Sequence, residues 1–294
     1  MYKLGIDLGG SKIEGVILDA SHKQLFRERV PTEQEGGYRH ILENLRTLYH
    51  NMRRHIADDP HTFGIGTPGA ISPRTGLLRN SNTLCLNNMP LKADLENLLG
   101  HPIAIQNDAN CFAMAEAIDG AGKENDLVFG VIMGTGCGGG IVYKQQVFTG
   151  THAIAGEWGH TSIDPNGPEC YCGGRGCVET FISGSGLEGH YQRAFGEKFS
   201  ATEIVQRYRT GDGNAIEIMQ KFFHYFGQAM ANLINVLDPD VVVLGGGLSN
   251  VDELYSTGAE EVRKRVFSDY CETPIVKNQL GDSAGVLGAA LIGC

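Results

Sequence analysis

Short apolar runs divide the first thirty residues into three strands. The runs cover residues 2–7, 13–18 and 24–30, and turns of glycine or polar residues separate them. This spacing predicts an antiparallel meander. A helical repeat then runs from Tyr38 to Ile56, and residues 62–66 form a buried strand. The chain therefore opens with three strands, one helix and a fourth strand.

The second half of the chain repeats this opening. An apolar strand at 127–133 is followed by the glycine-rich turn 134–140 and by strands at 141–143 and 146–149. The order is similar to the start of the ribonuclease-H-like ATPase fold of actin, Hsp70 and hexokinase-type sugar kinases. This resemblance implies an α/β protein with two similar domains around a cleft. We expect an N-terminal domain at 1–119 and a larger domain at 120–282, with helix 283–294 packing back on the first.

The remaining elements follow from the same periodicities. Helices are predicted at 91–99, 108–118, 184–195, 201–209, 213–237 and 251–267, and buried strands at 103–106, 241–244 and 274–277. Pro239 lies just beyond the longest helix and marks its end.

Composition and charge restrict the class of protein. The 294 residues suffice for one large or two ordinary domains, and the 41 glycines fall in clusters that suit loops close to a ligand. A net charge of −10 without a basic run argues against a nucleic-acid surface. No apolar run reaches membrane-spanning length, and Lys3 and Asp7 interrupt the first one, so no signal peptide and no membrane partner are expected. A cytoplasmic location is expected.

One histidine and three cysteines have the spacing of a metal site. His160, Cys170, Cys172 and Cys177 supply an imidazole and three thiolates, a set that Zn²⁺ favours in tetrahedral geometry. The alternative is that these cysteines are buried or form a disulfide, although Cys170 and Cys172 are too close in sequence to pair comfortably. Four protein ligands leave no position for water, so we expect the zinc to be structural.

Three glycine-rich stretches are candidates for binding a nucleotide. Asp7 and the turn after it, and the turn that begins the second half, place backbone N–H groups where phosphates could approach, and Asp7 could hold Mg²⁺ through water. A tight hairpin explains the first turn equally well. The third stretch follows a buried strand and offers a flat surface for adenine. The candidate residues are Asp7, Gly9, Gly10, Ser11 and Lys12; Gly134, Thr135 and Gly136; and Gly245, Gly246 and Gly247.

The polar residues near two strand ends suit a sugar acceptor. A loop containing Gly69 follows the strand 62–66, and Asn82 lies in a polar stretch behind it. Asn107 and Asp108 stand where a strand meets a helix. An Asp at this position is either a helix cap or a general base, and the residues alone favour neither.

The glycine loops, the Asn107–Asp108 pair and the stretches 156–160 and 170–179 together resemble the ROK family of bacterial sugar kinases and sugar-responsive repressors. The resemblance implies transfer of the ATP γ-phosphate to a hexose, with Asp108 as catalytic base. It implies acceptor ligands at Asn107, Glu157, His160 and Glu179, with Gly69 and Asn82 as further candidates. His160 would bind zinc through one ring nitrogen and a sugar hydroxyl through the other.

Within the family, Trp158, Ser183 and the stretch 237–250 are most similar to the fructokinase and mannokinase branch. We therefore expect fructose as the favoured acceptor, with mannose and glucose also used. The alternatives are an N-acetylglucosamine or N-acetylmannosamine kinase. A ROK repressor is disfavoured because its helix-turn-helix would have to precede Asp7. Family analogy also predicts a homodimer.

Overall fold

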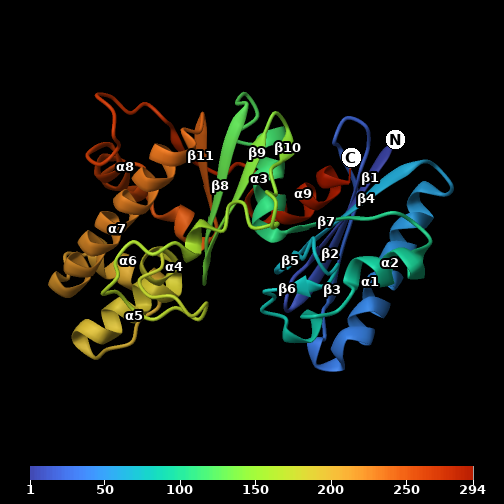
Figure 1. Ribbon diagram of the computed structural model, residues 1–294, viewed down its shortest axis with the longest axis horizontal. Coiled ribbons are helices and arrows are strands. Elements are labelled where there is room, and N and C mark those ends of the chain that lie inside the picture. Colours follow the sequence, from blue (N-terminus) through green and yellow to red (C-terminus); the bar gives the residue numbers. More distant parts are fainter. Residues whose placement is uncertain (294) are drawn as a thin grey trace. The chain divides into compact units, whose positions relative to one another are not determined.

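The structure, a computed structural model, describes residues 1–293 (Figure 1). Cys294, the last residue of the predicted helix 283–294, lies outside the described residues. The chain forms two compact units. The first contains residues 1–119, 145–155 and the C-terminal residues from 282, and the second contains residues 120–144 and 156–281. Each unit has its own apolar core, one around Leu4 and Phe63 and the other around Val131 and Phe223.

The first sheet confirms the predicted meander. Its strands have the order β3-β2-β1-β4-β7, in which β3, β2 and β1 are antiparallel and β1, β4 and β7 are parallel. The bounds are β1 Tyr2–Leu8, β2 Lys12–Leu18, β3 Gln24–Pro31, β4 His61–Thr67 and β7 Ala104–Asn107. A small hairpin of β5 Ala70–Ile71 and β6 Leu78–Arg79, which the periodicity did not predict, follows β4.

Helix α9 (Ala284–Ile292) packs against this sheet because both surfaces carry small residues. Gly5 and Gly64 are cross-strand neighbours in β1 and β4. A Cβ atom on Gly5 would lie 2.3 Å from the backbone nitrogen of Ala290, and one on Gly64 would lie 2.0 Å from the carbonyl oxygen of Ala289. Only glycine permits this approach. Helix α3 (Asp108–Asp119) lies beside α9 (Figure 1).

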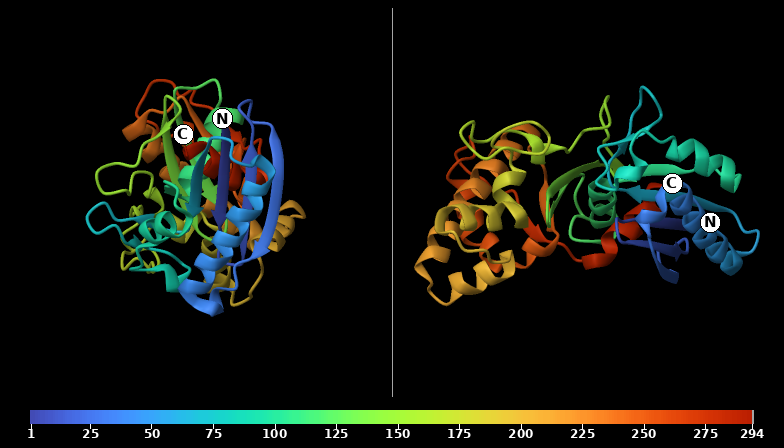
Figure 2. Two further views of the ribbon diagram at one scale, coloured as in Figure 1. Left: turned by 90° about the vertical axis from the view of Figure 1, so that its right-hand side faces the viewer. Right: turned by 90° about the horizontal axis from the view of Figure 1, so that it is seen from below.

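Helix α1 (Gly37–Ile56) contacts the meander strands β2 and β3 (Figure 2). Its apolar face buries Leu48 and Met52, and a Cβ atom at Gly15 of β2 would meet both side chains. The short helix α2 (Leu91–Leu99) packs beside α1. The predicted helix 38–56 and helix 91–99 are thus confirmed, each to within one residue.

The second sheet has the same order of strands as the first. Its order is β10-β9-β8-β11-β12, with β8 and β9 antiparallel and β8, β11 and β12 parallel. The bounds are β8 Leu127–Met133, β9 Cys137–Tyr143, β10 Gln146–Val147, β11 Val241–Gly245 and β12 Ile275–Lys277. The repeat seen in the sequence therefore corresponds to a repeat in topology.

Most of the helices of the second unit lie where the sequence predicted them. Helices α5 Gly184–Phe195, α6 Ala201–Arg209 and α7 Gly213–Leu237 match the predicted ranges. Helix α4 Glu179–Ile182 was not predicted, and α8 Thr257–Arg263 is shorter than the helix expected there. Asp212 caps the start of α7 by accepting the N–H of Ala215 at 3.0 Å. At its other end, the C-cap Asp238 has a left-handed φ of 47° and is followed by Pro239.

One predicted helix was wrong. The expected helix 251–267 is divided into a 3₁₀ turn at Asp252–Leu254 and the shorter α8. Ser256 separates them with φ −115° and ψ −83°, which lies outside the helical region and breaks the hydrogen-bond ladder. Within residues 1–293, no helix is both long and apolar enough to cross a membrane.

Candidate functional site

Polar residues of the first unit meet at the carboxyl ends of its parallel strands. Asp7 in β1 is paired with Gly66 in β4, and Thr67 at the end of β4 is paired with Asn107 at the end of β7. Asp108 follows as the first residue of α3. Open α/β sheets bind ligands at this edge. The fold thus brings together Asp7, Asn107 and Asp108, which are far apart in the sequence.

The structure assigns the helix cap to Asn107. Its side-chain oxygen accepts the backbone N–H of Asn110 at 2.8 Å, which is the hydrogen bond of an N-cap. Asp108 accepts the N–H of Ala109 at 2.9 Å through one oxygen, and its side chain is exposed to solvent. The carboxylate of Asp108 is therefore not needed to cap α3.

Neighbouring acids change the protonation of this cluster. Burial raises the pKa of Asp7 to about 6, and the nearby charges of Asp108 and Glu14 add to the effect, while Lys12 opposes it. The pKa of Asp108 is also raised, because protein atoms around its carboxylate displace much of the water that would stabilise the ionised form. A carboxylate with a raised pKa is a stronger proton acceptor when it is ionised.

The first glycine turn is a tight hairpin between β1 and β2. The N–H of Gly9 donates to the carbonyl of Lys12 at 2.9 Å, and the Thr32 hydroxyl donates to the carbonyl of Gly9 at 2.7 Å. Ser11 and Lys12 are exposed and available to a ligand. The buried hydroxyl of Thr83 has no hydrogen-bond partner within residues 1–293 and lies 3.6 Å from where a Cβ of Gly10 would be.

The loop after β4 has a shape that requires glycine at position 69. Gly69 has φ +84°, and a Cβ atom there would lie 2.3 Å from the carbonyl oxygen of Arg79. The side chain of Asn87 accepts the N–H of Ser81 at 2.9 Å and donates to its carbonyl at 2.8 Å. Asn82 follows Ser81 and is exposed. Gly69 therefore shapes this loop, while Asn82 has a free face for a ligand.

In the second unit, two glycine turns lie at one edge of the sheet. Gly245 in β11 is paired with Ile132 in β8, so the turns that follow these strands are neighbours. Gly246 has φ +77°, and a Cβ atom on it would lie 2.5 Å from the carbonyl oxygen of Met133. Gly134, Thr135 and Gly136 form the other turn, which closes through a hydrogen bond from Gly134 N to Gly136 O at 3.0 Å.

The segment 156–160 packs directly on β9. Gly156 has φ +90°, and a Cβ atom there would lie 2.5 Å from the carbonyl oxygen of Gly139. Trp158 is buried and meets Phe129 edge-to-face with ring centroids 5.9 Å apart. This packing fixes the backbone on either side of Trp158, and so positions Glu157 and His160.

The four predicted metal ligands converge in the second unit. One ligand atom from each of His160, Cys170, Cys172 and Cys177 lies within 4.8 Å of the other three. The Nδ1 atom of His160 is 3.6 Å from Cys170 Sγ, and the sulfurs of Cys172 and Cys177 are 3.7 Å apart. Two ligands at the tetrahedral angle around one zinc ion are separated by about 3.5–3.8 Å, given zinc bonds of about 2.0–2.3 Å.

These distances exclude the disulfide alternative for Cys172 and Cys177, because a disulfide bond is about 2.05 Å long. Within residues 1–293 every cysteine is a free thiol. Burial, followed by the neighbouring thiols, raises the pKa of Cys177 to about 12, so a cation is needed to keep it a thiolate at neutral pH. The ligand types and spacings therefore fit zinc.

The sequence did not single out Tyr171, the residue between the first two cysteines. Its hydroxyl is 3.1 Å from Nε2 of His160, and the two rings meet edge-to-face at 5.2 Å. Tyr171 is nevertheless 84 % exposed, so little of its ring is packed against the protein. The ring nitrogen of His160 that was expected to face a sugar hydroxyl is occupied by a phenol.

Cys137 was also missed. Its backbone N–H donates to a side-chain oxygen of Glu179 at 2.8 Å. Glu179, expected as an acceptor ligand, therefore also supports the second glycine turn. A backbone N–H has no sequence signature, so no pattern could have predicted this contact.

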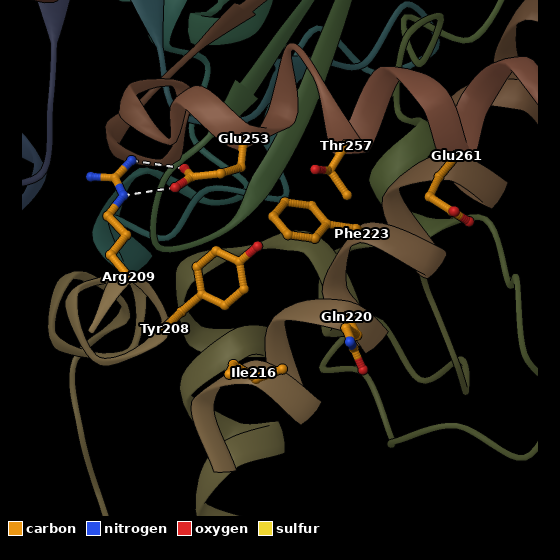
Figure 3. Close-up of a pocket in the computed structure, with 8 residues that line it drawn as sticks. All are labelled: Tyr208, Arg209, Ile216, Gln220, Phe223, Glu253, Thr257 and Glu261. Atoms are coloured by element: carbon orange, nitrogen blue, oxygen red, sulfur yellow. Dashed lines mark hydrogen bonds and ion pairs between the residues drawn. The ribbon is translucent and has the colours of Figure 1, made fainter. Parts of the chain in front are cut away.

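A hollow of about 680 Å³ lies elsewhere in the second unit, among α6, α7 and α8 (Figure 3). Arg209 crosses its rim and donates two hydrogen bonds of 2.8 Å to Glu253. The lining residues are Tyr208, Arg209, Ile216, Gln220, Phe223, Glu253, Thr257 and Glu261. None of them is among the predicted site residues, so the hollow is separate from the candidate site.

Comparison with known proteins identifies relatives along the whole chain. The model of the ROK family matches residues 3–293. The N-acetyl-D-glucosamine kinase of Pasteurella multocida is 37 % identical and covers 99 % of this chain and 98 % of its own. The corresponding Vibrio atlanticus kinase is 38 % identical over 98 % of each chain. The crystal structure of a ROK hexokinase from Thermus thermophilus has a TM-score of 0.91 at 32 % identity, covering 99 % of this chain and 97 % of that one.

Proposed function

This chain belongs to the ROK family and is an ATP-dependent sugar kinase, and we propose that its acceptor is N-acetyl-D-glucosamine. The expected family and the ribonuclease-H-like fold are thereby confirmed. The proposed acceptor replaces fructose, which the sequence favoured, with the alternative that it left open.

This proposal rests on the names of the relatives. Several full-length relatives at 35–38 % identity are N-acetyl-D-glucosamine kinases, from different bacterial genera. The aligned regions cover 98–99 % of the chain, so the similarity extends over both units and is not confined to one of them. The predicted site residues support the chemistry of the family rather than one sugar, since carboxylates, amides and an imidazole can bind the hydroxyls of any hexose.

For the transfer step we assign the base to Asp108. A base accepts the proton of the attacking hydroxyl, and an ionised carboxylate that no cap requires is suited to this. Glu157, His160 and Glu179, with Asn107, are proposed to bind the other hydroxyls. Asp7 is proposed to hold Mg²⁺, which neutralises phosphate charge when it is bound. The glycine turns are proposed to bind the phosphates, and Gly245–Gly247 the adenine.

A second candidate is an unmodified hexose, with fructose first. It is supported by the stretch from Cys177 to Ser183 and by Trp158, which resemble the fructokinase branch, and by the similarity to the ROK hexokinase. The two candidates differ in whether the site admits an acetamido group.

A panel of acceptors separates them. We would measure kcat/KM for N-acetylglucosamine, N-acetylmannosamine, glucose, mannose and fructose with ATP and Mg²⁺ under one set of conditions. We expect N-acetylglucosamine to exceed fructose by at least about tenfold, which corresponds to about 1.4 kcal/mol in the transition state. A tenfold preference for fructose would instead establish the second candidate.

We also propose that the protein is a homodimer, on family analogy alone. Light scattering should then give twice the chain mass of 31.7 kDa. A mass of one chain across micromolar concentrations would contradict it.

A further inference from the structure

One segment of the second unit connects the metal ligands to the second glycine turn. We call residues 177–185 the arm. It begins at the metal ligand Cys177, contains Glu179 at the start of α4, and ends at Ser185 in the first turn of α5. Ser183 caps α5 by accepting the N–H of Gly186 at 3.0 Å, which fixes the direction of the last residues of the arm.

The arm makes hydrogen bonds to Gly134 and Thr135 of the second glycine turn and to Cys137, the residue that follows the turn. Glu179 accepts the N–H of Cys137 at 2.8 Å, and the N–H of Gly184 donates to the carbonyl of Gly134 at 2.7 Å. Ser185 donates to the carbonyl of Thr135 twice, through its hydroxyl at 2.7 Å and its N–H at 3.3 Å. The arm therefore determines which groups of the turn face outward.

The backbone groups of the turn that the arm does not bind include two hydrogen-bond donors. The carbonyls of Gly134 and Thr135 point to the arm, whereas the N–H groups of Thr135 and Gly136 make no hydrogen bond to any residue within 1–293. Two adjacent backbone N–H groups without a protein partner form a concave site for an anion. The orientation of both peptides depends on the contacts that the arm makes.

We propose that the arm positions the Gly134–Cys137 turn for the nucleotide phosphates, with Ser185 as a positioning residue, and that Glu179 couples this turn to the acceptor. The inference rests on the proposed function, because it treats the turn as a phosphate loop and Glu179 as an acceptor ligand. A sugar hydroxyl bound to Glu179 restrains the carboxylate that holds Cys137. Bound acceptor therefore tightens nucleotide binding, and nucleotide tightens acceptor binding by the same factor.

Two glycines of the turn provide a matched pair of variants. A Cβ atom at Gly136 would lie 2.5 Å from the Glu179 carboxylate, whereas one at Gly134 would meet nothing within 4 Å. Neither glycine has a positive φ, so alanine fits the backbone at both. Gly136→Ala displaces Glu179, and Gly134→Ala reports what a methyl group in the turn does by itself.

The experiment is calorimetric titration of MgADP into the intact protein, with and without a saturating concentration of its best acceptor from the sugar panel. In the wild type, we expect acceptor to lower the Kd of MgADP by at least about fivefold. Ser185→Ala should raise that Kd about three- to tenfold, with the acceptor Kd unchanged, and Ser185→Thr should restore it because threonine keeps the hydroxyl.

Ser162→Ala is the control for Ser185→Ala. Ser162 is also exposed, and its hydroxyl also donates to a backbone carbonyl at 2.7 Å, that of Arg175. Its loss should leave the Kd of MgADP unchanged. The coupling factor is the Kd of MgADP without acceptor divided by its Kd with acceptor. Gly136→Ala should reduce this factor to about one, and Gly134→Ala should retain the wild-type value.

Wild-type affinity for MgADP in folded Ser185→Ala, or a coupling factor of one in the wild type, would overturn the inference. If none of the sugars is phosphorylated but the Kd of MgADP still depends on Ser185, the proposed acceptor is wrong and the positioning role of the arm stands.

Discussion

The side-chain oxygen of Asn107 lies 2.8 Å from the backbone nitrogen of Asn110, so α3 has its cap without the carboxylate of Asp108. Two adjacent residues at one strand-to-helix junction therefore have separable roles. A general base and a helix cap give different results on mutation, because loss of the cap destabilises the helix whereas loss of the base removes the proton acceptor without removing a stabilising contact of α3.

Asp108→Asn should fold with a Tm at least equal to that of the wild type, because the neutral amide avoids the cost of an ionised carboxylate whose pKa is raised. It should lose about 10²–10⁴-fold in kcat, because an amide cannot accept the hydroxyl proton. Asn107→Ala should instead destabilise the protein by about 1 kcal/mol through the lost cap. Thermal unfolding and steady-state kinetics of both variants measure the two effects. A near-normal kcat in Asp108→Asn would remove Asp108 from catalysis.

Asp7→Asn should stabilise the protein at pH 7.5 and not at pH 4. The pKa of Asp7 is raised to about 6 in the folded state, so its favourable contribution is fully present below its unfolded pKa of about 4. That contribution is lost as the pH rises through 6. At pH 7.5 the ionised Asp7 therefore costs stability, and the neutral amide avoids this cost.

Tm values of Asp7→Asn and wild type at the two pH values test this expectation. Asp58→Asn is the control, since that side chain is fully exposed and should not change Tm at either pH. Equal Tm values for Asp7→Asn and wild type at pH 7.5 would show that Asp7 carries no electrostatic penalty. We also expect Asp7→Asn to raise the Mg²⁺ concentration required for half-maximal activity, because the residue proposed to hold Mg²⁺ loses its charge.

Protein purified without added metal should contain one zinc ion per chain by elemental analysis. Cys172→Ser should lose the zinc and lower Tm, because serine is a poor ligand for zinc and the other three ligands cannot close the site. Cys85→Ser should retain one zinc, since Cys85 lies outside the metal cluster. A fully active preparation without metal would contradict a structural role for the ion.

Tyr171→Phe should lower the KM for the acceptor about two- to fivefold with the zinc content unchanged. With Nδ1 of His160 on the metal, Nε2 carries a hydrogen, and the phenol oxygen of Tyr171 accepts it at 3.1 Å. A sugar hydroxyl must displace this hydrogen bond to reach His160. A raised KM would mean that Tyr171 itself binds the sugar.

The sequence alone predicted most of the elements and the residues of a candidate metal site. The meander at 2–30 and its repeat after residue 127 follow from local alternation of apolar residues, which a strand in a half-buried sheet requires. His160 and the three cysteines are close in the chain, and glycines between them let the backbone turn, so their chemistry could be read without knowing the fold.

Only the tertiary structure decided how these groups work together. Whether Asn107 or Asp108 caps α3 depends on the backbone angles where β7 meets the helix. The raised pKa of Asp7 depends on its burial and then on the charge of Asp108, which is 101 positions away in the chain. The bond from Cys137 to Glu179 joins a backbone group to a side chain from another element. Local patterns record which face of each element is buried, whereas distances between elements arise from packing, so single-sequence patterns do not contain them.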